Sequence, residues 1–179
     1  MLKLVLTFVI GGALGVAAGF ATGIFVYPYI FLSAVVAAEI VDTAARKPVA
    51  AGRFVHANPS DPIHWGKGGV SVYPDLVHLE ADFEVGPGPK FHVYLVPDAA
   101  VTTATRVDKT RYVDLGRLKA FKGSQSYAVP PGVDPAAYGS VVIWCERFGV
   151  LISPARLQRL DQSSASMSGA IAAGSVFGA

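Results

Sequence analysis

The chain has 179 residues, of which 52% are hydrophobic and 16% charged, and its formal net charge at pH 7 is +2. No run of five or six like charges occurs, so the charge pattern gives no indication of nucleic-acid binding. The only cysteine, Cys145, excludes an internal disulfide. Because CxxC and CxxCH are also absent, the usual zinc, thioredoxin-like and covalent c-haem motifs are excluded, and we predict no metal site.

The N-terminal segment is uncharged from Leu4 to Ala38, which is longer than the roughly 20 helical residues that cross a bilayer. We predict one transmembrane helix over Leu4–Tyr27, within an uncleaved signal anchor over residues 1–38. A cleaved signal peptide is the alternative, because Val36-Ala37-Ala38 resembles a cleavage site. Such peptides, however, carry an apolar region of only about 7 to 15 residues.

Glycines recur at every fourth position of this predicted helix. Gly11, Gly15, Gly19 and Gly23 therefore share one face, where a second helix can approach closely. The pattern, a glycine zipper, predicts association with another copy of the chain or with a partner helix. Sequence bias in a glycine-tolerant span is the alternative. The charges flanking the helix do not indicate its orientation, since basic residues stand on both sides.

Residues 39–51 lack a strong periodicity and are interpreted as a tether, and residues 52–160 as the folded domain. Short alternating segments with glycine and proline turns predict an all-β domain, an antiparallel β-sandwich. We interpret Gly66, Gly68 and Gly69 as a turn, and Lys122-Gly123 as a break between two strands. The serine-, glycine- and alanine-rich residues 161–179 are predicted to be a disordered tail.

The segment Val77–Val85 alternates cleanly between apolar and polar residues. Its polar positions are His78, Glu80, Asp82 and Glu84, which share one face of a strand. One imidazole and three carboxylates are possible metal ligands. We favour a solvated outer face, because neighbours on one strand face lie about 7 Å apart and no second ligand strand is evident.

The strand around Cys145 belongs to a long apolar run, Tyr138–Leu157. Period two places Val141, Ile143 and Cys145 on one side and Val142, Trp144 and Glu146 on the other. Glu146 marks the wetter side, so we predict that Cys145 faces the core. A second apolar run follows, in which Gly149 is interpreted as a bulge or bend in a continuing strand.

Three stretches resemble the DM-thirteen family, whose domains occur beside DOMON domains or behind bacterial membrane anchors. They are VHLEADFEVGPGPKFHVYLVP, YVDLGRLKAFKGSQSYAVP and YGSVVIWCERFGVLISPARL, and the tripeptide Ile143-Trp144-Cys145 is the most specific part. The family's usual Gly-Pro-Asp is replaced here by Gly88-Pro89-Lys90. The resemblance implies a compact all-β domain on the extracytoplasmic (periplasmic) side of the membrane, with a proposed electron-transfer role for the cysteine.

A redox role requires Cys145 either as a thiolate that ligates haem or a metal, or as a thiol that cycles through a sulfenate or mixed disulfide. A thiolate needs a nearby cation or metal. We select Cys145, His92 and His64 as candidate cofactor-binding residues; His78 and Arg147 are further candidate partners. The alternative is that Cys145 only packs the core.

A second class of function is a non-enzymatic binding or scaffold module that holds a partner at the membrane surface. His56, His64 and Trp65 lie near one predicted loop and are candidates for such a surface. An enzyme is less favoured, because no nucleophile, base and orienting group show the spacing of a catalytic triad.

Overall fold

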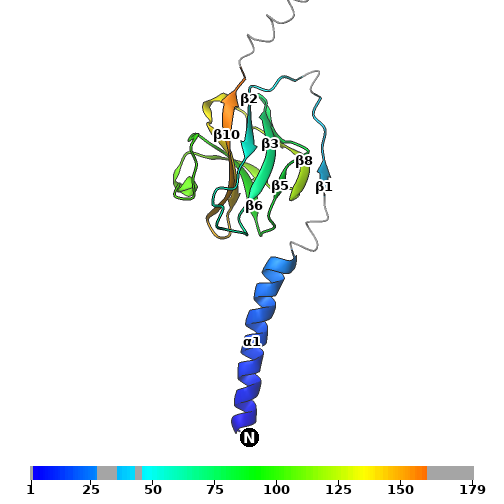
Figure 1. The fold of residues 1–179 in the computed structure, drawn as a ribbon, viewed down its shortest axis with the longest axis vertical. Helices are drawn as coiled ribbons and strands as arrows, with labels where there is room; N and C mark the ends of the chain where they lie inside the picture. The colour runs from blue at the N-terminus through cyan, green and yellow to red at the C-terminus, as the bar shows by residue number, and fades with distance from the viewer. Residues whose placement is uncertain (1, 28–35, 43–45, 161–179) are drawn as a thin grey trace, which may run out of the picture.

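The computed structural model of the chain describes residues 2–27, 36–42 and 46–160 (Figure 1). Helix α1 (Leu2–Tyr27) has 26 residues, and its stretch Leu2–Ile24 is long and apolar enough to cross a membrane. None of the side chains of that stretch is buried, so α1 is a candidate membrane anchor. The predicted tail, residues 161–179, lies outside the described residues.

The rest of the described chain consists of strands and two short 3₁₀ helices, η2 (Val107–Lys109) and η3 (Pro135–Ala137). The prediction of an all-β domain behind one helix is confirmed. The strands are β1 (Val36–Ala38), β2 (Ala50–Phe54), β3 (Gly66–Val72), β4 (Leu76–Leu79), β5 (Glu84–Val85), β6 (Phe91–Val96), β7 (Val113–Arg117), β8 (Lys122–Ala128), β9 (Ser140–Cys145) and β10 (Val150–Arg159).

The strands pair along one continuous path, β1-β8-β4-β3-β2-β10-β9-β6-β7, with β5 beside β3 and β8. The path does not divide into the two separate sheets of the predicted sandwich. The pairing is antiparallel except between β1 and β8, which are parallel. Strand β1 lies within the segment that we predicted as the anchor, and its Ala37 pairs with Gly123.

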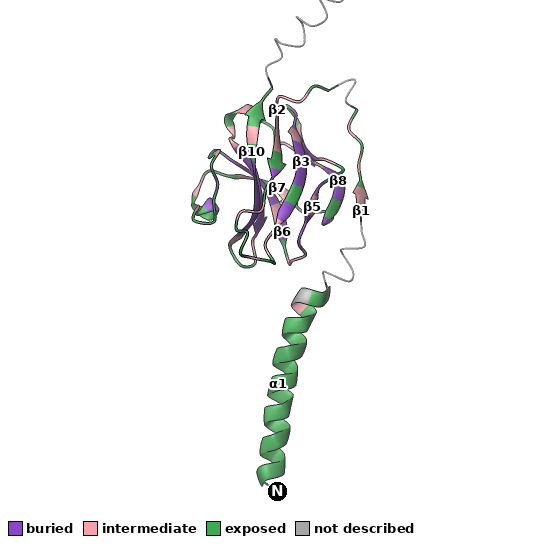
Figure 2. Cartoon of the chain, viewed as in Figure 1, coloured by how far each residue is buried: buried purple, intermediate pink, exposed green. Residues whose placement is uncertain are grey.

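Strand β9 is buried on both faces, and β6 is buried except at the partly exposed His92, because the domain has two apolar clusters. The main cluster gathers residues of β2, β3, β4, β6, β8, β9 and β10, so one face of the sheet encloses it. A smaller cluster on the other face of β6 and β9 includes Tyr94, Val142 and Trp144, with Val107 of η2 covering them. Most buried residues accordingly lie in the strands, whereas α1 is exposed (Figure 2).

Three predicted turns or strands are wrong. Gly66–Gly69 begins β3, and Lys122-Gly123 begins β8. The segment Val77–Val85 is not one strand, since it turns between β4 and β5. The turn is closed by a hydrogen bond from the amide of Phe83 to the carbonyl of Glu80 at 2.9 Å, and the carboxylate of Asp82 ties it to β3 by accepting the amide of Gly69 at 2.8 Å.

The interpretation of His78 and Gly149 also needs correction. His78 is not on a solvated face: only 6% of it is exposed, and its Nδ1 lies 2.9 Å from the hydroxyl of Ser126. Gly149 adopts a φ of +62° in the turn that joins β9 to β10, so these strands form an antiparallel hairpin and not one continuing strand.

Candidate functional site

Cys145 is the last residue of β9, and its side chain lies in the main core cluster with 1% exposure. The predicted orientation toward the core is confirmed. Sγ donates a hydrogen bond to the carbonyl of Pro89 at 3.2 Å. Burial raises the pKa of the thiol, although the backbone N–H groups of Phe148 and Arg147 donate to the sulfur and oppose that shift. Cys145 therefore rests as a neutral thiol.

His92 lies on the opposite side of the sheet from Cys145. In the ladder between β6 and β9, Phe91 pairs with Cys145 and His92 pairs with Trp144. Because neighbouring residues of a strand alternate between faces, Phe91 joins Cys145 in the main cluster and the His92 ring points outward. The structure thus does not bring these two candidate residues together.

His64 lies in the loop between β2 and β3, where it pairs with Asp61. The distance from His64 Nδ1 to Asp61 Oδ2 is 2.6 Å. This bond to His64, together with the amides of Ile63 and His64, lowers the pKa of Asp61 to about 2. Among the contacts of the described residues, none joins His64 to Cys145 or His92. The three candidates are therefore three separate places in the fold.

The burial of Cys145 decides whether its sulfur can ligate a haem or a metal. A haem iron bound to Sγ would have to displace part of the main cluster, since the side chain is packed among Phe91, Val93 and Ile143 of that cluster. The arrangement therefore does not fit ligation of a haem or metal by Cys145.

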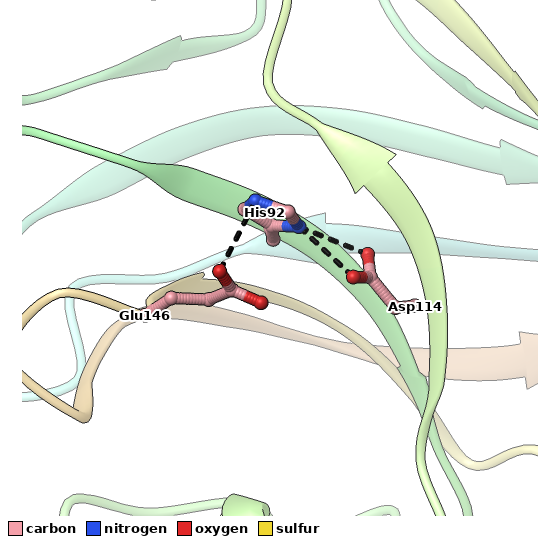
Figure 3. A group of neighbouring side chains, drawn as sticks. All are labelled: His92, Asp114 and Glu146. Carbon is pink, nitrogen blue, oxygen red and sulfur yellow. Dashed lines mark hydrogen bonds and ion pairs between the residues drawn. The ribbon is translucent and has the colours of Figure 1, made fainter.

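A polar cluster occupies the outer face, where three neighbouring strands bring together His92, Asp114 and Glu146 (Figure 3). His92 belongs to β6, Asp114 to β7, and Glu146 follows β9. His92 Nδ1 lies 3.1 and 3.0 Å from the two carboxylate oxygens of Asp114. On the other side of the ring, His92 Nε2 lies 3.4 Å from Glu146 Oε2.

Two more side chains hold Glu146 in place. Lys90 Nζ lies 2.9 Å from Glu146 Oε2, and the hydroxyl of Tyr94 donates to Glu146 Oε1 at 2.9 Å. The hydrogen bond from Lys90 is the largest cause of a lowered pKa of Glu146. Burial, and next the bond to Glu146, raises the pKa of Tyr94. The ring of Tyr94 also stacks on Tyr112, with centroids 4.4 Å apart.

A surface cleft of about 530 Å³ opens beside this cluster. Its lining includes Glu146, Lys90 and Tyr94, together with two partly exposed aromatic rings, Tyr112 and Phe148. The exposed fractions of these two residues are 38% and 51%. The outer-face cluster is therefore reachable from solvent, unlike the thiol of Cys145.

The sequence indicates His92 as a candidate, but it does not reveal Asp114, Tyr94 and Lys90 as members of the same cluster. Alternation within each strand does place His92, Tyr94 and Glu146 on outward positions. It does not tell which strands are adjacent, and the order β9-β6-β7 brings the cluster together.

The comparison with protein families identifies one match. Residues 59–157, more than half of the chain, match the family described as Electron transfer DM13. The matched range contains Cys145, the outer-face cluster and most of the strands. Comparisons with curated proteins and with solved structures find no match.

Proposed function

We propose that the chain, which belongs to the electron transfer DM13 family, transfers electrons by thiol–disulfide exchange at Cys145. The observation that carries the proposal is the position of Sγ between two backbone segments. One is its own turn, whose amides at Arg147 and Phe148 donate to the sulfur. The other is the loop between β5 and β6, whose Pro89 carbonyl accepts from it.

Movement of the loop between β5 and β6 exposes the sulfur and leaves the amides of its own turn in place. Those amides then stabilise a thiolate, the reactive form in exchange. The loop is held by Lys90, which pairs with Glu146 through its side chain and accepts the amide of Glu146 through its carbonyl at 3.2 Å. Lys90 also has a φ of +54°, which is uncommon for a residue with a side chain.

The exchange balances without a cofactor. The Cys145 thiolate attacks a disulfide of an oxidised partner protein, so an S–S bond forms to Cys145 while the partner's S–S bond breaks. The leaving sulfur takes the electron pair and the proton lost by Cys145. One thiol of a reduced dithiol partner then attacks Cys145 Sγ in the mixed disulfide, so that the oxidised partner leaves with two thiols. The second thiol of the reduced partner attacks its own sulfur in the new mixed disulfide, which closes that partner's disulfide and releases Cys145 as a thiol. Two electrons have passed from the reduced to the oxidised partner.

The test measures how fast Cys145 reacts with an aromatic disulfide that releases a coloured thiol, with the full chain in detergent micelles. We expect a reaction in native buffer that is faster than global unfolding permits and insensitive to low urea. Lys90→Ala should accelerate it, and Cys145→Ser should abolish it. Reaction only at the rate of global unfolding would contradict the proposal.

We further propose that α1 is an uncleaved signal anchor and that the domain lies on the extracytoplasmic (periplasmic) side. The exposed apolar surface of α1 supports the anchor, and the family resemblance supports the side. A phosphatase that is active only after export, fused after Arg159, should be active. If only a reporter that requires the cytoplasm is active at this junction, the domain lies on the other side.

The glycine face of α1 supports a proposal of helix association. No atom of the described chain lies near the open side of Gly11, Gly15, Gly19 or Gly23, so this face is free for a second copy. Replacing Gly15 and Gly19 with isoleucine should abolish crosslinking between copies. Replacing Ala17 and Ala21, on the opposite helix face, should not. Equal crosslinking in both variants would contradict the association.

The alternative function, a binding or scaffold module, is favoured by the cleft beside Glu146 and its exposed Phe148 and Tyr112. A module of this kind needs no thiol. Cys145→Ser should then keep partner capture in the membrane, whereas Phe148→Ala should lose it. The opposite pattern identifies thiol exchange as the function.

A further inference from the structure

We propose that His92 and Glu146 bind a divalent transition-metal ion on the outer face of the sheet, with Asp114 positioning the imidazole. The site is separate from the thiol of Cys145, because His92 and Glu146 lie outside the main core cluster that contains Cys145. The inference therefore does not rest on the proposed thiol exchange. Imidazole nitrogen and carboxylate oxygen together suit first-row divalent ions such as Zn²⁺.

The spacing of the two ligand atoms fits such an ion. His92 Nε2 and Glu146 Oε2 lie 3.4 Å apart. Two atoms that each lie about 2.1 Å from a zinc ion, at a roughly tetrahedral angle, are also separated by about 3.4 Å. An ion can thus be bound by both atoms without rearrangement of either strand.

Asp114 supplies the support that metal-binding histidines usually have. A ligating imidazole normally donates its second N–H to a carboxylate, which fixes the ring and the tautomer. Both oxygens of Asp114 face His92 Nδ1, and the amide of Gly116 holds Asp114 Oδ1 at 2.8 Å. With the proton on Nδ1, the lone pair of Nε2 faces the carboxylate of Glu146, and a cation between them removes the repulsion.

The neighbouring groups leave one oxygen of Glu146 for the ion. The hydroxyl of Tyr94 bonds Oε1, so Oε2 is the oxygen shared by His92 and Lys90. Lys90 Nζ occupies that oxygen at 2.9 Å, but its side chain is exposed and lies at the cleft. A metal ion can displace the ammonium group, and water from the cleft can complete the coordination.

The test titrates Zn²⁺ into the full chain in detergent micelles and measures the heat of binding. We expect one ion per chain in the wild type. His92→Gln and Glu146→Gln should abolish binding, and Asp114→Asn should weaken it about 10- to 100-fold. Lys90→Gln should strengthen it, because the competing ammonium is removed. His64→Gln is the matched control, since it removes another histidine that pairs with a carboxylate, and binding should be unchanged.

Two variants separate loss of the metal site from other effects. Cys145→Ser should bind Zn²⁺ as the wild type does, which separates this site from thiol exchange. Glu146→Gln retains an acceptor for Tyr94, so it tests the ligand even if His92→Gln fails to fold. The proposal is overturned if the wild type binds no Zn²⁺ at millimolar concentration, or if Glu146→Gln binds as tightly as His64→Gln.

Discussion

Cys145 and Glu146 are consecutive in the chain, but the sulfur of one lies in the main core and the carboxylate of the other lies in the polar cluster outside the sheet. The end of β9 thus carries a protected thiol on one face and solvent-reachable charge on the other. A substitution at Cys145 can therefore be tested for its effect on the polar cluster, and a substitution at Glu146 for its effect on the thiol.

The first prediction concerns Cys145→Ala, which should lower the free energy of unfolding by about 1 to 2 kcal/mol. The substitution removes a buried sulfur and leaves the Pro89 carbonyl without its donor. Urea denaturation measures the loss. Zn²⁺ affinity at His92 should stay unchanged. A loss indistinguishable from zero would mean that the sulfur does not contribute to core packing.

Gln125 carries a second prediction, because it is completely buried and bonds the backbone of the preceding turn. Its Oε1 accepts from the amide of Ala120 at 3.2 Å and from the hydroxyl of Tyr127 at 2.7 Å. Its Nε2 donates to the Ala120 carbonyl at 2.8 Å. Gln125→Leu removes all of these hydrogen bonds at once and leaves their partner groups unpaired.

We expect Gln125→Leu to cost about 2 to 4 kcal/mol, since each buried polar group left unpaired costs about 1 to 3 kcal/mol. The matched control is Gln158→Leu at the exposed C-terminal end of β10, which should change stability by less than about 0.5 kcal/mol. Equal unfolding midpoints for the two variants in urea would show that the turn does not depend on Gln125.

Alternation within β9 allowed accurate prediction of which of its residues face the main core. Val141, Ile143 and Cys145 lie in the main cluster, as their alternation predicts, while Val142 and Trp144 lie in the smaller one. Period two is a local property of a strand, so it needs no knowledge of the strand's neighbours.

The outer-face cluster could not be predicted in this way, since it depends on strands that are distant in sequence. His92 and Asp114 are 22 residues apart, and only the order of the sheet brings them together. Glycines were misleading for a related reason. Gly66 lies in β3, where a Cβ would come within 2.6 Å of the Ser153 side chain of β10. The position therefore needs a glycine for packing and not for a turn, a constraint that the local sequence does not reveal.

A third prediction compares two glycines that both have positive φ. Gly68 has a φ of +108°, and a Cβ there would meet the main chain of Phe83. Gly132 has a φ of +83° and open space around it. Gly132→Ala should therefore cost about 1 to 2 kcal/mol from backbone strain alone, and Gly68→Ala clearly more. Similar unfolding free energies for both variants would contradict the close approach.

The last prediction concerns Glu39, which ties the chain just after β1 to β8. Its Oε1 pairs with Lys119 Nζ at 2.7 Å, and its Oε2 accepts the amide of Ser126 at 3.0 Å. The hydrogen bond from Lys119 is the largest cause that lowers the pKa of Glu39 below the usual 4.5; burial opposes it. The charged form is therefore favoured in the folded state.

Because the folded pKa of Glu39 is depressed, its contribution to stability is present above pH 4.5 and is lost as the pH falls through the lower folded value. For a pair this exposed, the contribution is below about 1 kcal/mol, so a local signal is the better measurement. The amide resonance of Ser126 should titrate with a midpoint below pH 4.5, and Glu39→Gln should remove that titration. The amide of Gly69, which donates to Asp82, should titrate in both proteins. A Ser126 midpoint at or above 4.5 would show that Lys119 does not stabilise the carboxylate.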